Sequence, residues 1–155
     1  MHNLKIVRSL LTTTAILFIA DSGRTWGGSE QADPPTATLT VNLTLAGRSK
    51  VGEVGCALFR DAKGFPLDDS RATTLWQPAG QTLTCVFERL THGSYAVAVS
   101  HDLNGNRRTD RNFIGMPKEA WGVSNNARPS LRAPRFQEAV VQLSENLSIA
   151  IEVRK

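Results

Sequence analysis

The segment from 101 to 110 holds the side chains whose types and spacing point most directly to chemistry. Counted from Asp102, oxygen-bearing side chains occupy positions one, three, five and nine of a calcium loop of the EF type, namely Asp102, Asn104, Asn106 and Asp110. A tightly curled loop turns alternate side chains inward, and a hard cation takes about six to eight oxygen ligands. The main-chain carbonyl of Arg108, at position seven, adds a further ligand. The pattern predicts a calcium-binding loop.

Other residues of the same loop argue against tight binding. Arg107 takes the sixth position, where the turn favours glycine, and Phe113 takes the twelfth, where a bidentate glutamate is usual. Arg108 and Arg111 add positive charge. Glu119 is a candidate further ligand if the chain folds back. The alternative is an Asx-rich turn whose side chains cap their own backbone, and we expect any calcium affinity to be weak, as in extracellular modules.

A hydrolase-type enzyme is the alternative function for this region. Ser100, His101 and Asp102 are consecutive, but neighbours in a strand point to opposite faces and cannot form a nucleophile–base–orienter triad. The remaining catalytic hypothesis uses His101, Asp102 and Glu119, which would have to converge on a pocket. The main hypothesis is a module that is not an enzyme.

The region after the loop supplies candidate ligand contacts. Trp121 is either a platform for a sugar or another ligand, or a plug that closes the end of the fold. The other candidate contacts are polar or ionisable side chains of the long loop and the strand before it: His101, Glu119, Ser124, Asn125 and Asn126.

Period-two patterns predict the elements that position these residues. Leu39, Val41, Leu43 and Leu45 alternate with polar residues, which is typical of a strand with one buried face. We expect further strands at 54–59, 73–76, 81–87, 94–101, 140–143 and 147–153. About seven strands predict an all-β fold, an antiparallel β-sandwich that is immunoglobulin-like or prealbumin-like. A long irregular loop at 102–135 precedes the last two strands.

The N-terminus has the pattern of a secretory signal peptide. Lys5 and Arg8 precede an apolar stretch of about 11 residues, which is too short to span a bilayer, and Ala20 and Ser22 fit a cleavage site. An uncleaved anchor is the alternative. We expect a signal peptide at 1–22, a flexible linker at 23–36 and a single domain at 37–155. The mature protein would be periplasmic or secreted, with no stable membrane anchor after leader cleavage.

The cysteines predict a disulfide, and the distribution of charge excludes one class of partner. Cys56 and Cys85 are the two cysteines, and in an exported protein such a pair usually forms a disulfide. The formal net charge is +4, but the basic residues are scattered and no aromatic stacking platform accompanies them. We therefore expect no nucleic acid among the partners.

Several motifs along the chain also resemble one family. They are Tyr95-Ala96-Val97-Ala98-Val99, His101-Asp102-x-Asn104-x-Asn106, Asp110, Gly115-x-Pro117-x-Glu119, Gly122-x-Ser124-Asn125-Asn126 and Pro134-x-Phe136-x-x-Ala139. Together they resemble an uncharacterised bacterial family catalogued as domain of unknown function 2141, over roughly residues 38–154. The resemblance implies an exported β-sandwich and brings no activity. The family usually has glycine at the position of Arg107, which weakens the metal prediction for this chain.

These observations favour a periplasmic, non-enzymatic binding or structural module of unknown ligand. Its long loop would be ordered by calcium or by its own hydrogen bonds. The partner would be an unknown ligand or a protein of the cell envelope, and calcium is the cofactor that the sequence suggests. A carrier for a small apolar molecule is a further alternative, although no sequence feature requires the cavity that it would need.

Overall fold

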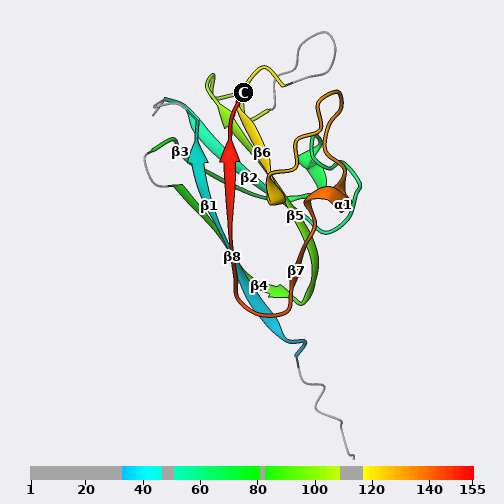
Figure 1. Ribbon diagram of the computed structural model, residues 1–155. Helices are drawn as coiled ribbons and strands as arrows, with labels where there is room; N and C mark the ends of the chain where they lie inside the picture. Colours follow the sequence, from blue (N-terminus) through cyan, green and yellow to red (C-terminus); the bar gives the residue numbers. More distant parts are fainter. Residues whose placement is uncertain (1–32, 47–50, 81–82, 109–116) are drawn as a thin grey trace, which may run out of the picture. The chain divides into compact units, whose positions relative to one another are not determined.

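The chain forms an all-β sandwich in which two sheets pack face to face (Figure 1). The computed structural model describes residues 33–46, 51–80, 83–108 and 117–155. The predicted signal peptide at 1–22, most of the predicted linker, and Asp110, Arg111, Phe113 and Gly115 lie outside these residues. Within them, no helix has the length and apolar character needed to cross a membrane.

The smaller sheet has the order β4-β1-β8. Its strands are β4 (Leu83–Thr91), β1 (Thr36–Leu45) and β8 (Leu147–Val153). β1 pairs with β4 in antiparallel fashion but with β8 in parallel. The other strand pairs of the described residues are antiparallel, so the predicted antiparallel β-sandwich is confirmed with one parallel pair in it. The parallel pair arises because β8 follows a strand of the other sheet and crosses over to β1, where no tight hairpin fixes its direction.

The larger sheet has the order β3-β2-β5-β6, and β7 pairs with β5 beside this path. Its strands are β3 (Thr73–Pro78), β2 (Glu53–Phe59), β5 (Gly93–Asp102), β6 (Trp121–Val123) and β7 (Val141–Leu143). One edge of β5 pairs with β2 along its length. The other edge pairs with β7 near its start and with β6 near its end. β5 therefore organises this sheet.

The core between the sheets follows the predicted alternation. Leu39, Val41 and Leu43 of β1 are buried against inward residues of the other sheet, such as Val97 and Val99. The predicted disulfide is present: the sulfur atoms of Cys56 on β2 and Cys85 on β4 are 2.01 Å apart. Because β2 and β4 belong to different sheets, this bond links the two layers directly.

A second, smaller core covers part of the outer face of the larger sheet. Phe59, Ala96, Ala98, Val123 and Ala139 form it. Phe65 packs edge-to-face between Phe59 and Phe136, with ring centroids 5.3 and 5.9 Å away. The helical turn α1 (Phe136–Ala139) contributes to this cover. The larger sheet is thus buried on both faces along part of its length, and the rest of its outer face is available for a site.

The disulfide generates the first prediction. Replacing both cysteines, as Cys56→Ala/Cys85→Ala, should lower the free energy of unfolding by about 3–4 kcal/mol, because the bond closes a loop of about 30 residues in the unfolded chain. Urea titration of the oxidised protein, the reduced protein and the double variant measures this difference. The reduced protein should resemble the variant, and a reductant should not change the variant. Equal midpoints for all samples would contradict the expectation.

Candidate functional site

The carboxylate of Asp102 organises the loop that follows β5. Asp102 is fully buried, with 0% of its surface exposed. Its Oδ1 accepts the main-chain N–H groups of Asn104 and Gly105 at 3.1 and 2.8 Å, and its Oδ2 accepts that of Arg107. A buried carboxylate without such partners would be very costly. The chain therefore turns sharply after β5, so that three main-chain N–H groups reach this carboxylate.

The same contact repeats along the loop at two-residue intervals. Asn104 Oδ1 accepts the N–H of Asn106 at 3.1 Å, and Asn106 Oδ1 accepts that of Arg108 at 2.8 Å. These Asx turns are those expected of a loop that caps its own backbone. They are also compatible with a calcium loop, because each oxygen has more than one lone pair. Asp110, the fourth predicted side-chain ligand, lies outside the described residues.

Arg107 has the left-handed backbone that the sixth position of the loop requires. Its φ of 53° lies in the region where glycine is favoured. Its guanidinium forms a two-pronged ion pair with Glu53 on β2, with N–O distances of 2.8 and 2.9 Å. It also lies 5.8 Å from the centre of the Trp76 ring. The hydrogen bond from Arg107 lowers the pKa of Glu53 below its ordinary value. These contacts keep an arginine in a conformation better suited to glycine.

Glu119 lies against the same loop and is only 7% exposed. Its Oε1 accepts the N–H of Leu103 at 2.9 Å. Its Oε2 is buried and has no hydrogen-bond partner among the described residues. Buried polar atoms nearly always have a partner, so this oxygen is a candidate contact for a water molecule or an ion.

His101 lies on the strand beside this cluster and is 5% exposed. Its Nε2 is 2.8 Å from the main-chain oxygen of Val51 and donates to it. The structure therefore brings His101, Asp102 and Glu119 to one end of the sandwich. All three hydrogen-bond to main chain, and none of them lines the groove described below. The catalytic hypothesis remains a prediction.

Ser124, Asn125 and Asn126 hold the chain together just after β6. Ser124 is fully buried; its Oγ accepts the N–H of Val97 on β5 and donates to the carbonyl of Ala139. Asn125 donates to the carbonyl of Val140 at 3.0 Å. Asn126 accepts the N–H of Glu152 on β8 at 2.8 Å. All three side chains are therefore engaged with the backbone of other segments, and none of them lines the groove described next.

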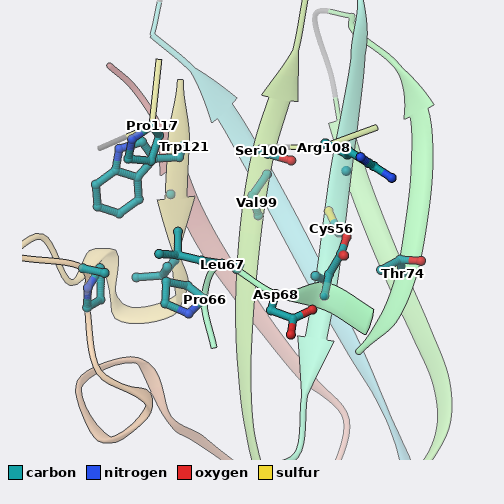
Figure 2. A pocket seen from close by; sticks show the side chains of 18 of the residues that line it. Cys56, Pro66, Leu67, Asp68, Thr74, Val99, Ser100, Arg108, Pro117 and Trp121 are labelled. Atoms are coloured by element: carbon teal, nitrogen blue, oxygen red, sulfur yellow. The ribbon is translucent and has the colours of Figure 1, made fainter. Parts of the chain in front are cut away.

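A groove of about 390 Å³ opens on the outer face of the larger sheet (Figure 2). Its lining includes Gly55 and Ala57 of β2, Ala98 and Ser100 of β5, Thr74 and Trp76 of β3, Trp121 of β6, and Asp68, Asp69, Arg108, Pro117 and Arg132 from loops. Figure 2 shows Trp121 and Pro117 on one side, Thr74 and Arg108 on the other, and Ser100 between them. Of the candidate ligand contacts, Trp121 lines this groove.

The register of the strands explains the centre of the groove. Trp76 pairs with Gly55, Gly55 with Ser100, and Ser100 with Trp121, which places these four residues in one row across four strands. A Cβ atom on Gly55 would lie 2.6 Å from the Trp76 ring, so the indole lies directly over the glycine. Sequence reasoning missed Trp76, Gly55 and Ser100. The sequence signal that could have indicated a groove is the run of small residues at alternate positions of β2 and β5, which leaves room above the sheet.

Arginine side chains fix the wall and the rim of the groove. The guanidinium of Arg128 lies 4.2 Å from the centre of the Trp121 ring and donates to the main-chain oxygen of Arg154 at 2.8 Å. At the rim, Arg132 pairs with Glu138 through two hydrogen bonds. The N–H of Arg135 also donates to Glu138. These donors, the guanidinium of Arg132 first, lower the pKa of Glu138 to about 2.

Comparison with known proteins gives one result. The model of the family described as "Uncharacterized protein conserved in bacteria (DUF2141)" matches residues 45–150, which is most of the chain. The chain belongs to this family, and the resemblance seen in its motifs is confirmed. No curated protein and no solved structure matches the chain. The description of the family names no activity.

Ser124 provides a test of the structural role of this segment. Ser124→Ala should destabilise the fold by about 1–3 kcal/mol, because the buried N–H of Val97 and the carbonyl of Ala139 lose their shared partner. Urea unfolding measures the loss. Ser148→Ala is the matched control: Ser148 is an exposed residue of β8 that accepts a hydrogen bond from the exposed side chain of Asn42, so its loss should change stability much less. Similar small changes in both variants would contradict the structural role.

Glu138 provides a test by pH. Its pKa is lowered in the folded state, so its ionised form stabilises the fold above the ordinary pKa of about 4.5, and this contribution disappears as the pH falls towards about 2. The urea midpoint of the wild type should exceed that of Glu138→Gln at neutral pH, and the two should converge near pH 2. Glu145→Gln, on the exposed turn before β8, should follow the wild type. A difference that stays constant across this range would contradict the pKa shift.

Proposed function

We propose that the domain is a non-enzymatic binding module, exported to the periplasm or beyond, whose loop after β5 takes up a calcium ion. The observation that carries the calcium site is the buried Glu119 Oε2, which has no partner among the described residues and belongs to a carboxylate already fastened to the loop. A cation bound in the loop would provide the missing partner. Glu119 would then replace the glutamate that calcium loops usually carry at position twelve.

The loop carries further oxygen atoms that could serve as ligands. The carboxylate of Asp102 accepts three N–H bonds and has about four lone-pair positions, so one remains for a cation. The side-chain oxygens of Asn104 and Asn106 and the carbonyl of Arg108 complete the proposed set, with Asp110 as a further ligand. Hard oxygen ligands of this kind suit calcium better than zinc or copper.

The charge around the loop argues for weak affinity. Asp102 and Glu119 place two carboxylates beside the proposed ion. The ion pair with Glu53 offsets the charge of Arg107, whereas the exposed Arg108 still opposes a cation. No three His, Cys, Asp or Glu side chains of the described residues gather in a metal-holding group, so the site depends on amide and carbonyl oxygens. Such a set fits a dissociation constant on the order of 0.1–1 mM, as in extracellular modules.

Two observations support an exported module over an enzyme. The inter-sheet disulfide fits an oxidising compartment, in agreement with the signal-peptide pattern of the N-terminus. The His101 ring and the carboxylates of Asp102 and Glu119 are directed to main-chain groups. In this arrangement their hydrogen bonds to the main chain stabilise one end of the sandwich. The groove, whose floor is formed by small side chains, is the better candidate for contact with a ligand.

Thermal unfolding of the oxidised full-length chain tests the calcium site. Calcium at about 10 mM should raise the midpoint by roughly 4–13 °C over the value in a chelator, because a ligand that binds only the folded state stabilises it by mass action. Glu119→Gln should abolish the rise. It should change the midpoint in chelator little, because the amide oxygen can still accept the N–H of Leu103 and the position of Oε2 has no partner to lose among the described residues.

The matched control is Glu145→Gln, which removes the same charge from an exposed turn and should keep the full calcium response. Two outcomes would overturn the calcium proposal. One is an unchanged midpoint of the wild type in calcium. The other is a Glu119→Gln variant that responds to calcium as the wild type does.

A further inference from the structure

We infer that the groove on the outer face of the larger sheet binds a neutral, hydroxyl-rich sugar ring of a glycan. The inference rests on the proposed function in one respect, namely that the domain is a binding module, and it does not require the calcium site. Its basis is the row Trp76–Gly55–Ser100–Trp121, in which two indoles border two residues with little or no side chain.

The floor of the groove is formed by small residues. Gly55 and Ala57 of β2 lie beside Ser100 and Ala98 of β5, so only small side chains rise from the sheet there, and the Trp76 indole covers the Gly55 end. Elsewhere on the same face, Phe59, Phe65 and Phe136 fill the space above the sheet. The area over these small side chains is therefore a local hollow, and its volume of about 390 Å³ lies within the range of about 300–1,000 Å³ typical of small-ligand sites.

Two indoles border this hollow at opposite sides. Trp76 and Trp121 are three strand spacings apart, roughly 14 Å between their backbones. The Trp76 ring lies over Gly55 and so lines the floor from one side. Arg128 packs against the Trp121 ring and fixes it at the other. Indole surfaces are broad, apolar and rigid, which suits the C–H face of a sugar ring.

The polar groups of the groove match hydroxyl groups better than any charged ligand. Asp68 and Asp69 supply carboxylate acceptors, and Arg108 supplies guanidinium donors on the side of the groove where Thr74 also lies (Figure 2). The hydroxyl of Ser100 lies between the walls. A phosphate would meet the two aspartates, and a cation would meet Arg108. Glu138 already offsets the charge of Arg132 at the rim.

An apolar ligand fits less well, because it would cover carboxylate and guanidinium groups without offering them hydrogen bonds. A neutral saccharide has apolar ring faces and hydroxyl groups that both donate and accept. It therefore satisfies the indole walls and the charged groups at the same time, which makes it the ligand class that the groove favours.

Calorimetric titration of the oxidised full-length chain with three neutral hexasaccharides tests this inference. The probes are cellohexaose, chitohexaose and maltohexaose. At least one should bind with a dissociation constant on the order of 0.1–1 mM. Trp121→Ala and Trp76→Ala should each weaken binding by about tenfold or more, because each removes one stacking surface. Val86→Ala, on the outer face of β4 in the other sheet, is the control and should bind like the wild type.

Two milder variants guard against loss of folding. Asp69→Asn is on an exposed 3-10 turn and should weaken binding a few-fold while leaving the thermal midpoint unchanged. Gly55→Ala keeps both indoles but forces Trp76 away from the floor, and it should weaken binding as strongly as Trp76→Ala.

The titrations are run in calcium and in chelator, so that the two proposals can fail separately. Saccharide binding by a chain that shows no calcium response would overturn the calcium proposal alone. Absence of binding to all three probes at about 10 mM would overturn the glycan inference, whatever the calcium response. Binding that Trp76→Ala and Trp121→Ala leave unchanged would overturn it as well.

Discussion

The buried carboxylate of Asp102 is the contact on which both candidate sites depend. It ends β5 by accepting three N–H groups of the following turn, and it thereby winds the chain into a compact loop. That winding brings Arg107 back to β2, where it meets Glu53 and Trp76. It also places Arg108 beside the groove. Without a buried anion at this position, the N–H groups would have no common acceptor and the loop would lose its shape.

β5 is the second constraint, because it connects the loop to the groove. Its edge away from β2 is shared by β6 and β7, which are only three residues long. Pairing over three residues is weak by itself, so the side chains of Ser124, Asn125 and Asn126 supply the missing attachment. The bond between Ser124 and Val97 holds the end of β6 beside β5, whereas Asn125 and Asn126 attach the same turn to Val140 and to β8. The register of β6 on β5 places Trp121 in the same row as Ser100.

Strands in which apolar and polar residues alternate could be predicted from the sequence. Short segments that are held in place by side-chain hydrogen bonds could not. The buried residues of β1 follow from the period-two pattern, and the disulfide agrees with the prediction made from two cysteines in a chain with a signal-peptide pattern. β6 is too short to show a period, and its place depends on Ser124, whose bonds to β5 and α1 span distant parts of the chain. The Asx turns of the loop after β5 could be predicted because each joins residues that are two or three positions apart in the sequence. The groove could not, because the pairing of Trp76 with Gly55 requires the strand register.

Arg107 occupies a backbone conformation that glycine would adopt more easily. Glycine would reach a φ of 53° at no steric cost, whereas arginine has to be held there. The ion pair with Glu53 is largely exposed, and an isolated surface pair contributes little. The guanidinium also lies near the Trp76 ring, at the opposite end of the row from Arg128 and Trp121. Both tryptophans of the groove are thus backed by an arginine. The guanidinium that adds positive charge to the loop therefore also packs beside one wall of the groove, so the loop and the groove share this residue.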